Sequence, residues 1–482
     1  MKNIKKYKSG ILFFLVYIFT LSGCVTNKKQ SMLYENCLNS GAYDQAATLC
    51  EKDAEGSDIL ANLNYGYALR CNKDHKKSID TFDKAENIFK AAQEDYILHS
   101  GGKVLSAALV NEGFTPYSGK LYEFSLVNIY KSQSFMFLGN FDLARVEINR
   151  ALDRQRRAKE FFSSELDVEK KKAADQSKNS LKEHISISEA DKSSKVSIAL
   201  SEHYSNMNNF EIFANYTNPF ITYYAGIYFL LSGENVKAVD LLKEASAMAP
   251  ENKYIKDDLL MAIKASKNID DRAPSPAAKS ETQPPLTTIY EKTSRFAWIL
   301  FENGPGPELE SLTIPIPLII VTSKAPYTEI ALPRHKDGLC ALDCLTVSNS
   351  RESLKSEIVA DMNAVALTEF KSRFPAVLIR SIVSASVKSG MQVAAHKLAG
   401  DLGALALGIY TAVVTEADTR HWSSLPSRYE LAKIRIDGTN GEIKIGPTSE
   451  EQTISLNPTS NHLVFVNKRT NTSPLFINSV AF

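Results

Sequence analysis

Cysteine has the widest chemistry of the residue types in this 482-residue chain, and it occurs six times. Cys340 and Cys344 are close enough to form a disulfide if their segment is a loop. The pair could also supply two ligands to zinc, but a structural zinc site needs four, and no second pair or histidine cluster lies nearby. We therefore expect buried or bridged cysteines, with Cys340 and Cys344 as the candidate disulfide, and neither metal nor cofactor.

Two stretches have the spacing of catalytic or phosphate-binding motifs, but neither is complete. Ser100-Gly101-Gly102-Lys103 has a Ser-x-x-Lys spacing, yet the Ser-Asp-Asn and Lys-Thr-Gly motifs that accompany it in penicillin-interacting enzymes are missing. Residues 113–120 are similar to a phosphate loop, but they are one residue too long, and Leu121 replaces the Ser or Thr that binds magnesium. The sequence favours a protein that is not an enzyme, with no catalytic residues.

A third chemistry is lipid attachment at Cys24. The chain begins with a lysine-rich segment, continues with the uncharged stretch Ile11 to Thr20, and reaches Leu21-Ser22-Gly23-Cys24. This order is typical of a secretory signal, and the apolar stretch is shorter than the roughly 20 residues of a spanning helix. The tetrad resembles the lipobox of bacterial lipoproteins. That resemblance implies a signal peptide over 1–23, acylation of Cys24 (with palmitate, for example) and a lipidated tether over 24–34.

The composition excludes two classes of interaction. A net charge of +1 gives no global basic field for nucleic acid, so we expect no nucleic-acid partner. After the signal, no uncharged apolar run reaches about 18 residues, so we expect no further membrane span. By resemblance to Gram-negative lipoproteins, Val25 after the cysteine indicates the outer membrane, with the protein anchored by lipid and facing the periplasm.

Helical repeats are predicted for residues 35–268 by a recurring spacing of small and large residues. In the tetratricopeptide template a small residue is followed by a large one four positions later and a small one three positions after that. The small residues let the second helix of a pair pass close to the first. A weaker copy covers 41–50. The three clear copies are Ser78, Phe82 and Ala85 with Gly66; Ala144, Ile148 and Ala151; and Ala238, Leu242 and Ala245 with Gly226.

Such repeats cannot bury their apolar faces alone, so neighbouring pairs must stack. Stacking would leave a concave groove, which we expect to bind envelope proteins. Between the second and third copies, residues 154–201 are predicted to be a charged helical insertion. It could be a projecting helix that contacts a partner, but its mixed charges favour a solvated helix or a partly disordered insertion. Residues 269–286 are rich in proline and polar residues and are predicted to be a linker.

Residues 287–482 change in character and predict a smaller α+β domain. Ile358 and Val365 recur at helical spacing, and Pro375 is expected to begin a second helix, followed by a third over Leu402–Ala417. A strand hairpin is predicted from residues 431–436 and 442–445, with further strands at 463–466 and 475–477. The fold class is therefore mainly α, with degenerate tetratricopeptide-like repeats before the α+β domain.

Ala417 to Pro426 reads Ala-Asp-Thr-Arg-His-Trp-Ser-Ser-Leu-Pro. It resembles the Ala-Asp-x-Arg-x-Trp-x-x-Leu-Pro signature of a family of uncharacterised bacterial tetratricopeptide-repeat envelope lipoproteins. Residues 144–153 and 300–317 match the same family in the expected order. The resemblance implies export and, for some members, a link to cell-wall synthesis, and it implies no activity.

Asp418, Arg420 and Trp422 allow two interpretations. A carboxylate, a guanidinium and an indole suit recognition of an anionic or sugar-like group. They also suit a structural corner, in which Asp418 and Arg420 pair while Trp422 packs beneath Leu425-Pro426. We favour the corner, because the motif lies where a helix ends and a strand begins.

Together these patterns predict a lipid-anchored scaffold or adaptor, linked to cell-wall or outer-membrane processes. Its partners would be envelope proteins, bound in the repeat groove, and the membrane, bound through the N-terminal lipid. The alternative is an envelope enzyme that acts on the cell wall, with its site in the C-terminal domain.

Overall fold

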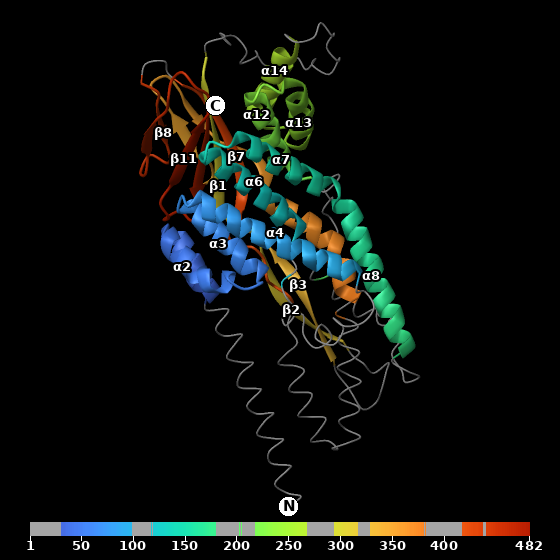
Figure 1. Ribbon diagram of the computed structural model, residues 1–482. Helices are drawn as coiled ribbons and strands as arrows, with labels where there is room; N and C mark the ends of the chain where they lie inside the picture. The colour runs from blue at the N-terminus through green and yellow to red at the C-terminus, as the bar shows by residue number, and fades with distance from the viewer. Residues whose placement is uncertain are drawn as a thin grey trace, which may run out of the picture.

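The computed structural model describes residues 30–98, 117, 119–179, 202, 204, 217–267, 294–316, 328–379, 381, 417–436 and 440–482. Helices occupy the first part of the chain, and the C-terminal part contains three β-sheets together with a helical segment over 362–379 (Figure 1). No helix in the described ranges is long and apolar enough to cross a membrane. Cys24, the linker and nearly all of the predicted helix 402–417 lie outside the described residues.

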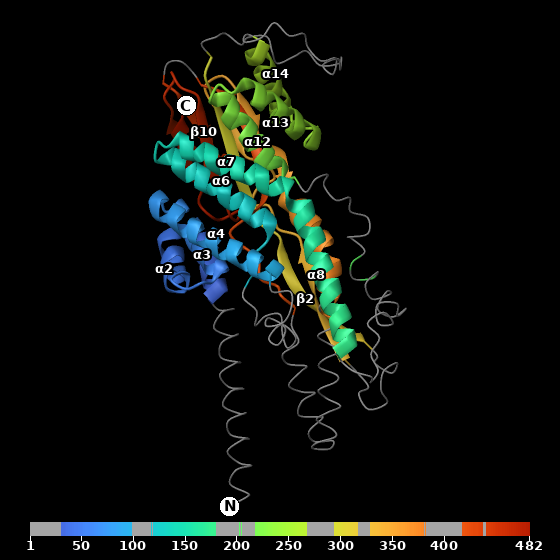
Figure 2. The ribbon, with the colours of Figure 1, turned by 45° about the vertical axis from the view of Figure 1, so that its right-hand side comes forward.

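Most consecutive helices lie side by side, as Figures 1 and 2 show. The first helix covers residues 30–40. The helices that follow are α2 (Tyr43–Ala54), α3 (Ile59–Cys71), α4 (His75–Leu98), α6 (Leu121–Phe137), α7 (Phe141–Arg156), α8 (Ala158–Asn179), α12 (Pro219–Leu231), α13 (Asn235–Met248) and α14 (Lys253–Lys267). The charged segment from residue 154 thus contains α8, which projects along the side of the molecule.

Asparagine caps and turn glycines set the limits of these helices. Gly139 and Gly233 lie between the helices of their pairs with φ of 75° and 80°, a conformation that costs glycine little. Asn140 caps α7 by accepting from the amide of Leu143 at 3.1 Å. Asn218 does the same for α12, where Pro219 occupies the first helical position.

The largest sheet has the strand order β11-β10-β1-β7-β6. β1 pairs in parallel with β10, and the other neighbours are antiparallel. Its strands are β1 (Phe296–Pro305), β6 (Glu357–Asp361), β7 (Pro426–Arg435), β10 (His462–Lys468) and β11 (Phe476–Ala481). β2 (Glu308–Ile316) and β3 (Thr328–Lys336) form an antiparallel pair, and the third sheet has the order β5-β4-β8-β9, from β4 (Thr346–Ser348), β5 (Ser353–Lys355), β8 (Glu442–Ile445) and β9 (Gln452–Ser455).

Three local predictions for the C-terminal region were wrong. Ile358 lies in β6 rather than in a helix, because pairing with β7 overrides a short periodic pattern. The helix begins at residue 362 and passes through Pro375 without a break over the described residues. The predicted hairpin does not form: β7 pairs with β1 and β6, whereas β8 pairs with β4 and β9 in a different sheet.

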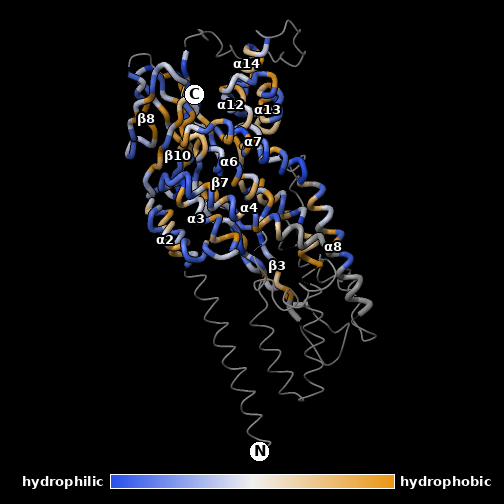
Figure 3. The backbone as a smooth tube through the Cα atoms, viewed as in Figure 1, coloured by the Kyte–Doolittle hydropathy of each residue, from blue (hydrophilic) through white to orange (hydrophobic). Residues whose placement is uncertain are grey.

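The helices cover one face of the large sheet, and both share one continuous hydrophobic core. Alternate residues of β1 face the helices, as a strand requires: the Trp298 indole donates to Asp258 of α14, and Glu302 bonds to Arg70 of α3. The ring of Phe220 in α12 stacks on Tyr429 of β7 with centroids 3.7 Å apart. Figure 3 shows hydrophobic residues in the strands around β10, where helices and sheet meet.

Because of this packing, the concave groove predicted from the sequence is not open to a partner. α3, α6 and α12 are the first helices of the three predicted pairs, and their inner faces would line a concave surface. In the structure that surface is covered by the chain's own β1, β7 and β10. These helices are buried almost all round, so they are covered on both sides. The groove is therefore filled from within the chain.

Candidate functional site

Arg70 and Glu302 form a buried ion pair between α3 and β1. The guanidinium Nη2 lies 3.0 and 3.2 Å from the two carboxylate oxygens, and Nη1 donates to Gln133 of α6. Tyr67 and Asn467 also donate to Glu302. Burial alone would lower the pKa of Arg70, but Glu302 raises it well above its usual range, so the arginine is charged at any ordinary pH.

Trp422 lies in the middle of this interface. Its side chain is 2% exposed, and its ring meets the rings of Tyr67, Phe82 and Tyr130 edge to face. The centroids are 5.8 to 6.3 Å apart, within the range of favourable aromatic contacts. The indole N–H has no hydrogen-bond partner among the described residues, so packing holds the ring. The tryptophan therefore joins α3, α4 and α6 at one point.

Asp418 and Arg420 pair with each other, as the corner interpretation requires. Arg420 Nε and Nη2 donate to the two oxygens of Asp418 at 2.8 and 2.9 Å. Burial alone would raise the pKa of Asp418, but the guanidinium of Arg420 holds it below the usual value. Two residues further on, the amide of Trp422 donates to Glu123 of α6 at 2.8 Å. The bidentate pair shapes the segment that delivers Trp422 to the helices.

Residues 423–425 continue the contact. The Tyr34 hydroxyl, on the first helix, hydrogen bonds to Ser424 Oγ at 2.7 Å and to the carbonyl of Asn64 at 2.9 Å. Arg469, at the end of β10, donates to the carbonyls of all three residues of the segment at 2.9 to 3.1 Å. We call residues 418–425 the corner segment. It connects the first helix, α3 and α6 to β7, which begins directly after it, and to the end of β10, where Arg469 lies.

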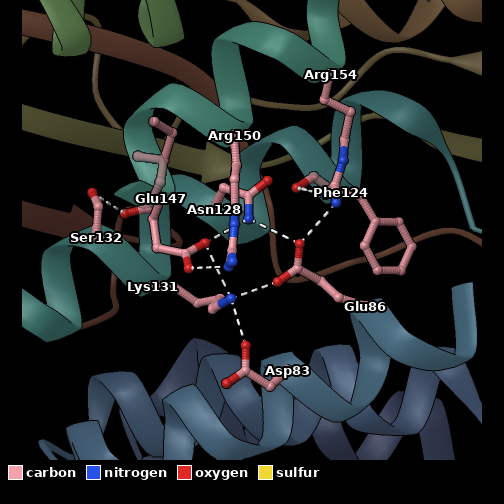
Figure 4. A network of polar contacts seen from close by, with 10 residues as sticks. Asp83, Glu86, Phe124, Asn128, Lys131, Ser132, Glu147, Arg150 and Arg154 are labelled. Atoms are coloured by element: carbon pink, nitrogen blue, oxygen red, sulfur yellow. Dashed lines mark hydrogen bonds and ion pairs between the residues drawn. The ribbon is translucent and has the colours of Figure 1, made fainter. Parts of the chain in front are cut away.

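A second polar cluster joins α4, α6 and α7 at Lys131 (Figure 4). Its ammonium lies 2.5 Å from Glu86, 2.6 Å from Asp83 and 3.1 Å from Glu147. Asn128 donates to both Glu86 and Glu147. Arg150 forms an ion pair with Glu147, and Arg154 forms one with Glu86. Burial alone would lower the pKa of Lys131, but the pairing with Glu86 and Glu147 raises it. The cluster therefore holds two successive helix pairs together.

The N-terminus of α6 is held by two buried glutamates. Glu369, from the helix over 362–379, accepts from the amides of Leu121 and Tyr122 at 2.9 and 3.0 Å. Glu123 accepts from the amide of Lys120 and from the hydroxyl of Tyr117. Carboxylates are favoured there because the free amides carry partial positive charge. Burial raises the pKa of both glutamates above the usual range.

A small cavity of about 20 Å³ adjoins this end of α6 and has room for one water-sized molecule. Glu369 and Thr368 lie in its wall with apolar residues of α6, α8 and α12. Because Glu369 is already bound by two amides and the cavity is so small, the site suits a structural water better than a substrate.

The predicted packing residues of the helix pairs lie in the core. Ser78, Phe82 and Ala85 are fully buried, as are Ala144, Ile148 and Ala151 and also Ala238, Leu242 and Ala245. A Cβ on Gly66 would lie 2.7 Å from the Phe82 ring, and one on Gly226 would lie 2.8 Å from Leu242 Cγ. The Ser78 hydroxyl also donates to the Gly66 carbonyl at 2.7 Å. The close approach that the spacing predicted is thus present in the first and third copies.

The cysteines of the described chain are all free thiols, so the candidate Cys340–Cys344 disulfide is not formed. The loop around Cys340 is fixed by Asn303, whose side-chain oxygen accepts from the amides of Ala341 and Leu342. Its amide nitrogen donates to the carbonyl of Leu342 and to Glu430. In this loop Cys340 is exposed and Cys344 is half-buried.

Other sequence predictions concern metal ligands, the Ser-x-x-Lys spacing, Cys24 and the family resemblance. Within the described ranges, no group of three or more His, Cys, Asp or Glu side chains could hold a metal ion. Ser100 to Lys103, with its Ser-x-x-Lys spacing, lies outside the described residues, as does Cys24. Comparison of the chain with protein-family models, curated proteins and solved structures finds no match. The family resemblance of residues 417–426 therefore stays a prediction.

Sequence reasoning missed Arg70, Glu123, Lys131 and Glu302. Arg70 and Glu302 are the single charged residues of α3 and β1, and Glu302 directly follows Phe-Ala-Trp-Ile-Leu-Phe. Glu123 and Lys131 are the two charged residues of α6, which is buried along most of its length. A charge in such a place is buried only when a partner neutralises it. That signal could have predicted that each has a partner, although not which residue the partner is.

Proposed function

We propose that this protein is a lipid-anchored scaffold or adaptor of the bacterial envelope, attached through Cys24 to the outer membrane and facing the periplasm. The observation that carries the proposal is how its polar residues are used. The corner segment, the Arg70–Glu302 pair and the Lys131 cluster all connect helices to one another or to the sheet. They tie the helices and the sheet into one body around a shared core. Such a body suits the presentation of a fixed surface to a partner.

We further propose that the three helix pairs are degenerate tetratricopeptide repeats. The contacts of Gly66 with Phe82 and of Gly226 with Leu242 support this, because the repeat needs a small residue at each crossing. Since the chain's own sheet covers the inner helices, the partner surface would lie on the outer helices. α7 and α13 are joined there by Arg145 with Glu234 at 2.9 Å and by Lys237 with Asn149 at 2.8 Å.

Apolar side chains are exposed on these two outer helices. They are Leu143 and Val146 of α7 and Val236 of α13. Apolar side chains exposed on a polar surface are a common feature of protein-binding sites. An envelope enzyme, the alternative, gains no comparable support from the C-terminal region, whose buried Glu302 and Glu430 are both occupied by hydrogen bonds within the chain.

Site-specific photo-crosslinking in cells tests the adaptor proposal. A photoreactive amino acid at Val146 or Val236 should give the same discrete crosslinked product. The matched control is Thr453, which is exposed on β9 in the four-stranded sheet and should give none. Equal products at all three positions, or none at the two valines, would count against a partner on the outer helices.

The lipid anchor is tested separately. Blocking the lipoprotein signal peptidase with a globomycin-type inhibitor should leave a larger precursor, because residues 1–23 stay attached. Replacement of Cys24 by alanine should release the protein from the membrane fraction. A protein that keeps its size and its membrane attachment in both experiments would refute anchoring through Cys24.

A further inference from the structure

The first helix is held on the body from its first turn. Gln30 Nε2 donates to the carbonyl of Leu49 at 3.0 Å and to Asp53 of α2 at 2.6 Å. One turn later Tyr34 is buried and bonds to the corner segment, and Leu38 is fully buried below it. The helix therefore has one inner face with a fixed orientation to the rest of the protein.

The outer face of the same helix carries no charge. Its exposed residues are Ser31, Met32, Leu33, Asn36 and Ser40. Met32 is 59% exposed and Leu33 44%, although a soluble surface is expected to place few large apolar side chains side by side. Glu35, the one acidic residue in the helix, is partly buried, and burial raises its pKa above the usual value. An uncharged face with two adjacent apolar side chains suits the interface of a bilayer.

The position of the helix in the chain points to the same occupant. Cys24, the lipid attachment site, is six residues before Gln30, and six extended residues span at most about 20 Å. Lys28 and Lys29 lie in this short connection and carry the charge that anionic headgroups attract. Because Gln30 is already fixed to α2, the lipid cannot be far from Met32 and Leu33.

From these observations we propose that the first helix lies on the membrane surface, with Met32 and Leu33 inserted beside the lipid anchor. The inference rests on the proposed lipidation of Cys24. The protein is then held close to the bilayer in one orientation rather than on a long tether. The corner segment fixes that orientation, because Tyr34 joins the helix directly to Ser424.

Fluorescence quenching by lipid tests this directly. The lipidated full chain would be placed in phosphatidylethanolamine–phosphatidylglycerol vesicles, with part of the lipid brominated near the start of its acyl chains. Leu33→Trp and Met32→Trp each add a probe to the helix, and Val236→Trp is the control, since Val236 is 62% exposed on α13. The native Trp298 and Trp422 are both buried and give a constant background.

We expect bromolipid to quench the emission of Leu33→Trp and Met32→Trp well beyond that of the parent, and that of Val236→Trp no more than the parent. Equal quenching of all variants, or none at residues 32 and 33, would overturn the proposal and leave a protein partner as the occupant of this face. Sedimentation with the vesicles reports anchoring independently, so failed lipidation is distinguished from a helix that stays off the bilayer.

Discussion

Arg70 and Glu302 are 232 residues apart in the chain, yet two charge-assisted hydrogen bonds join them inside the interface of α3 and β1. Both side chains are almost fully buried. Removing two charges from water is costly, and only good geometry and additional donors offset that cost. Here Tyr67, Gln133 and Asn467 complete the arrangement. The pair therefore specifies how the helices register on the sheet.

We predict that Glu302→Gln destabilises the protein by about 3–5 kcal/mol, because it leaves the buried Arg70 without a counter-charge. Chemical denaturation measures the loss. The double variant Arg70→Met with Glu302→Leu should recover part of it, since it removes both charges but leaves Tyr67, Gln133 and Asn467 without these hydrogen bonds. Arg145→Ala is the control: it breaks an exposed pair with Glu234 and should cost no more than about 1 kcal/mol. Similar losses for both pairs would contradict the argument.

Gly66 and Gly226 test the helix pairs. Alanine favours a helix over glycine by about 0.8–1 kcal/mol, yet its methyl group would overlap Phe82 or Leu242. We predict that Gly66→Ala and Gly226→Ala each lower the unfolding free energy by about 1–3 kcal/mol, the cost of an overfilled core. Phe82→Leu should lower the unfolding free energy less in the Gly66→Ala background than in the parent protein. Leu242→Ala should likewise cost less in the Gly226→Ala background. Additive losses would show that the two side chains do not meet.

The sequence predicted this pairing because local spacing carries it: Gly66 and Phe82 belong to adjacent helices joined by a short turn. It could not predict that the inner helices would face β1, since Arg70 and Glu302 are distant in the chain and no local pattern relates them. The strands β7 and β8 were predicted to form a hairpin because they are close in the sequence, whereas most of their actual partners are distant in the chain. Asp418 and Arg420 are two residues apart, so their pairing was foreseeable, but the aromatic rings that receive Trp422 were not.

The burial of Trp422 in the corner segment can be tested by its fluorescence. Trp298 and Trp422 are the two tryptophans of the chain, and both are almost fully buried. In Trp298→Phe the remaining Trp422 should therefore emit at short wavelength and resist quenching by acrylamide. A red-shifted, readily quenched emission would mean that Trp422 is open to a ligand, as the binding-site interpretation supposes.

Trp422→Ala should destabilise the protein by about 3–5 kcal/mol, as expected for a large ring removed from a packed core. Arg420→Ala should cost less, because its pair with Asp418 is partly exposed. Thermal unfolding measures both. If Arg420→Ala were the more harmful change, the pair rather than the ring would hold the corner segment.

Thiol labelling tests the free cysteines. Cys340 is exposed and should react first with a maleimide in the folded protein. Cys50 and Cys71 should react only after unfolding, because both are buried and burial raises their pKa to about 12 and about 11. Mass spectrometry of the labelled peptides separates the sites. A Cys340 that reacts only after reduction would instead show the disulfide with Cys344.

Glu123 and Glu86 should respond to pH in opposite directions. Burial raises the pKa of Glu123, so its contribution to stability is full below the usual glutamate range and is lost as pH rises through the raised pKa. At Glu86, burial would raise the pKa, but Lys131 and Arg154 lower it, so its contribution is present at neutral pH and lost on acidification. Glu123→Gln should therefore cost more stability at about pH 4 than at about pH 8, and Glu86→Gln the reverse. Denaturation of both variants and the parent at the two pH values measures this, and a shift of the same sign in both variants would show that one of these charge environments is not as described.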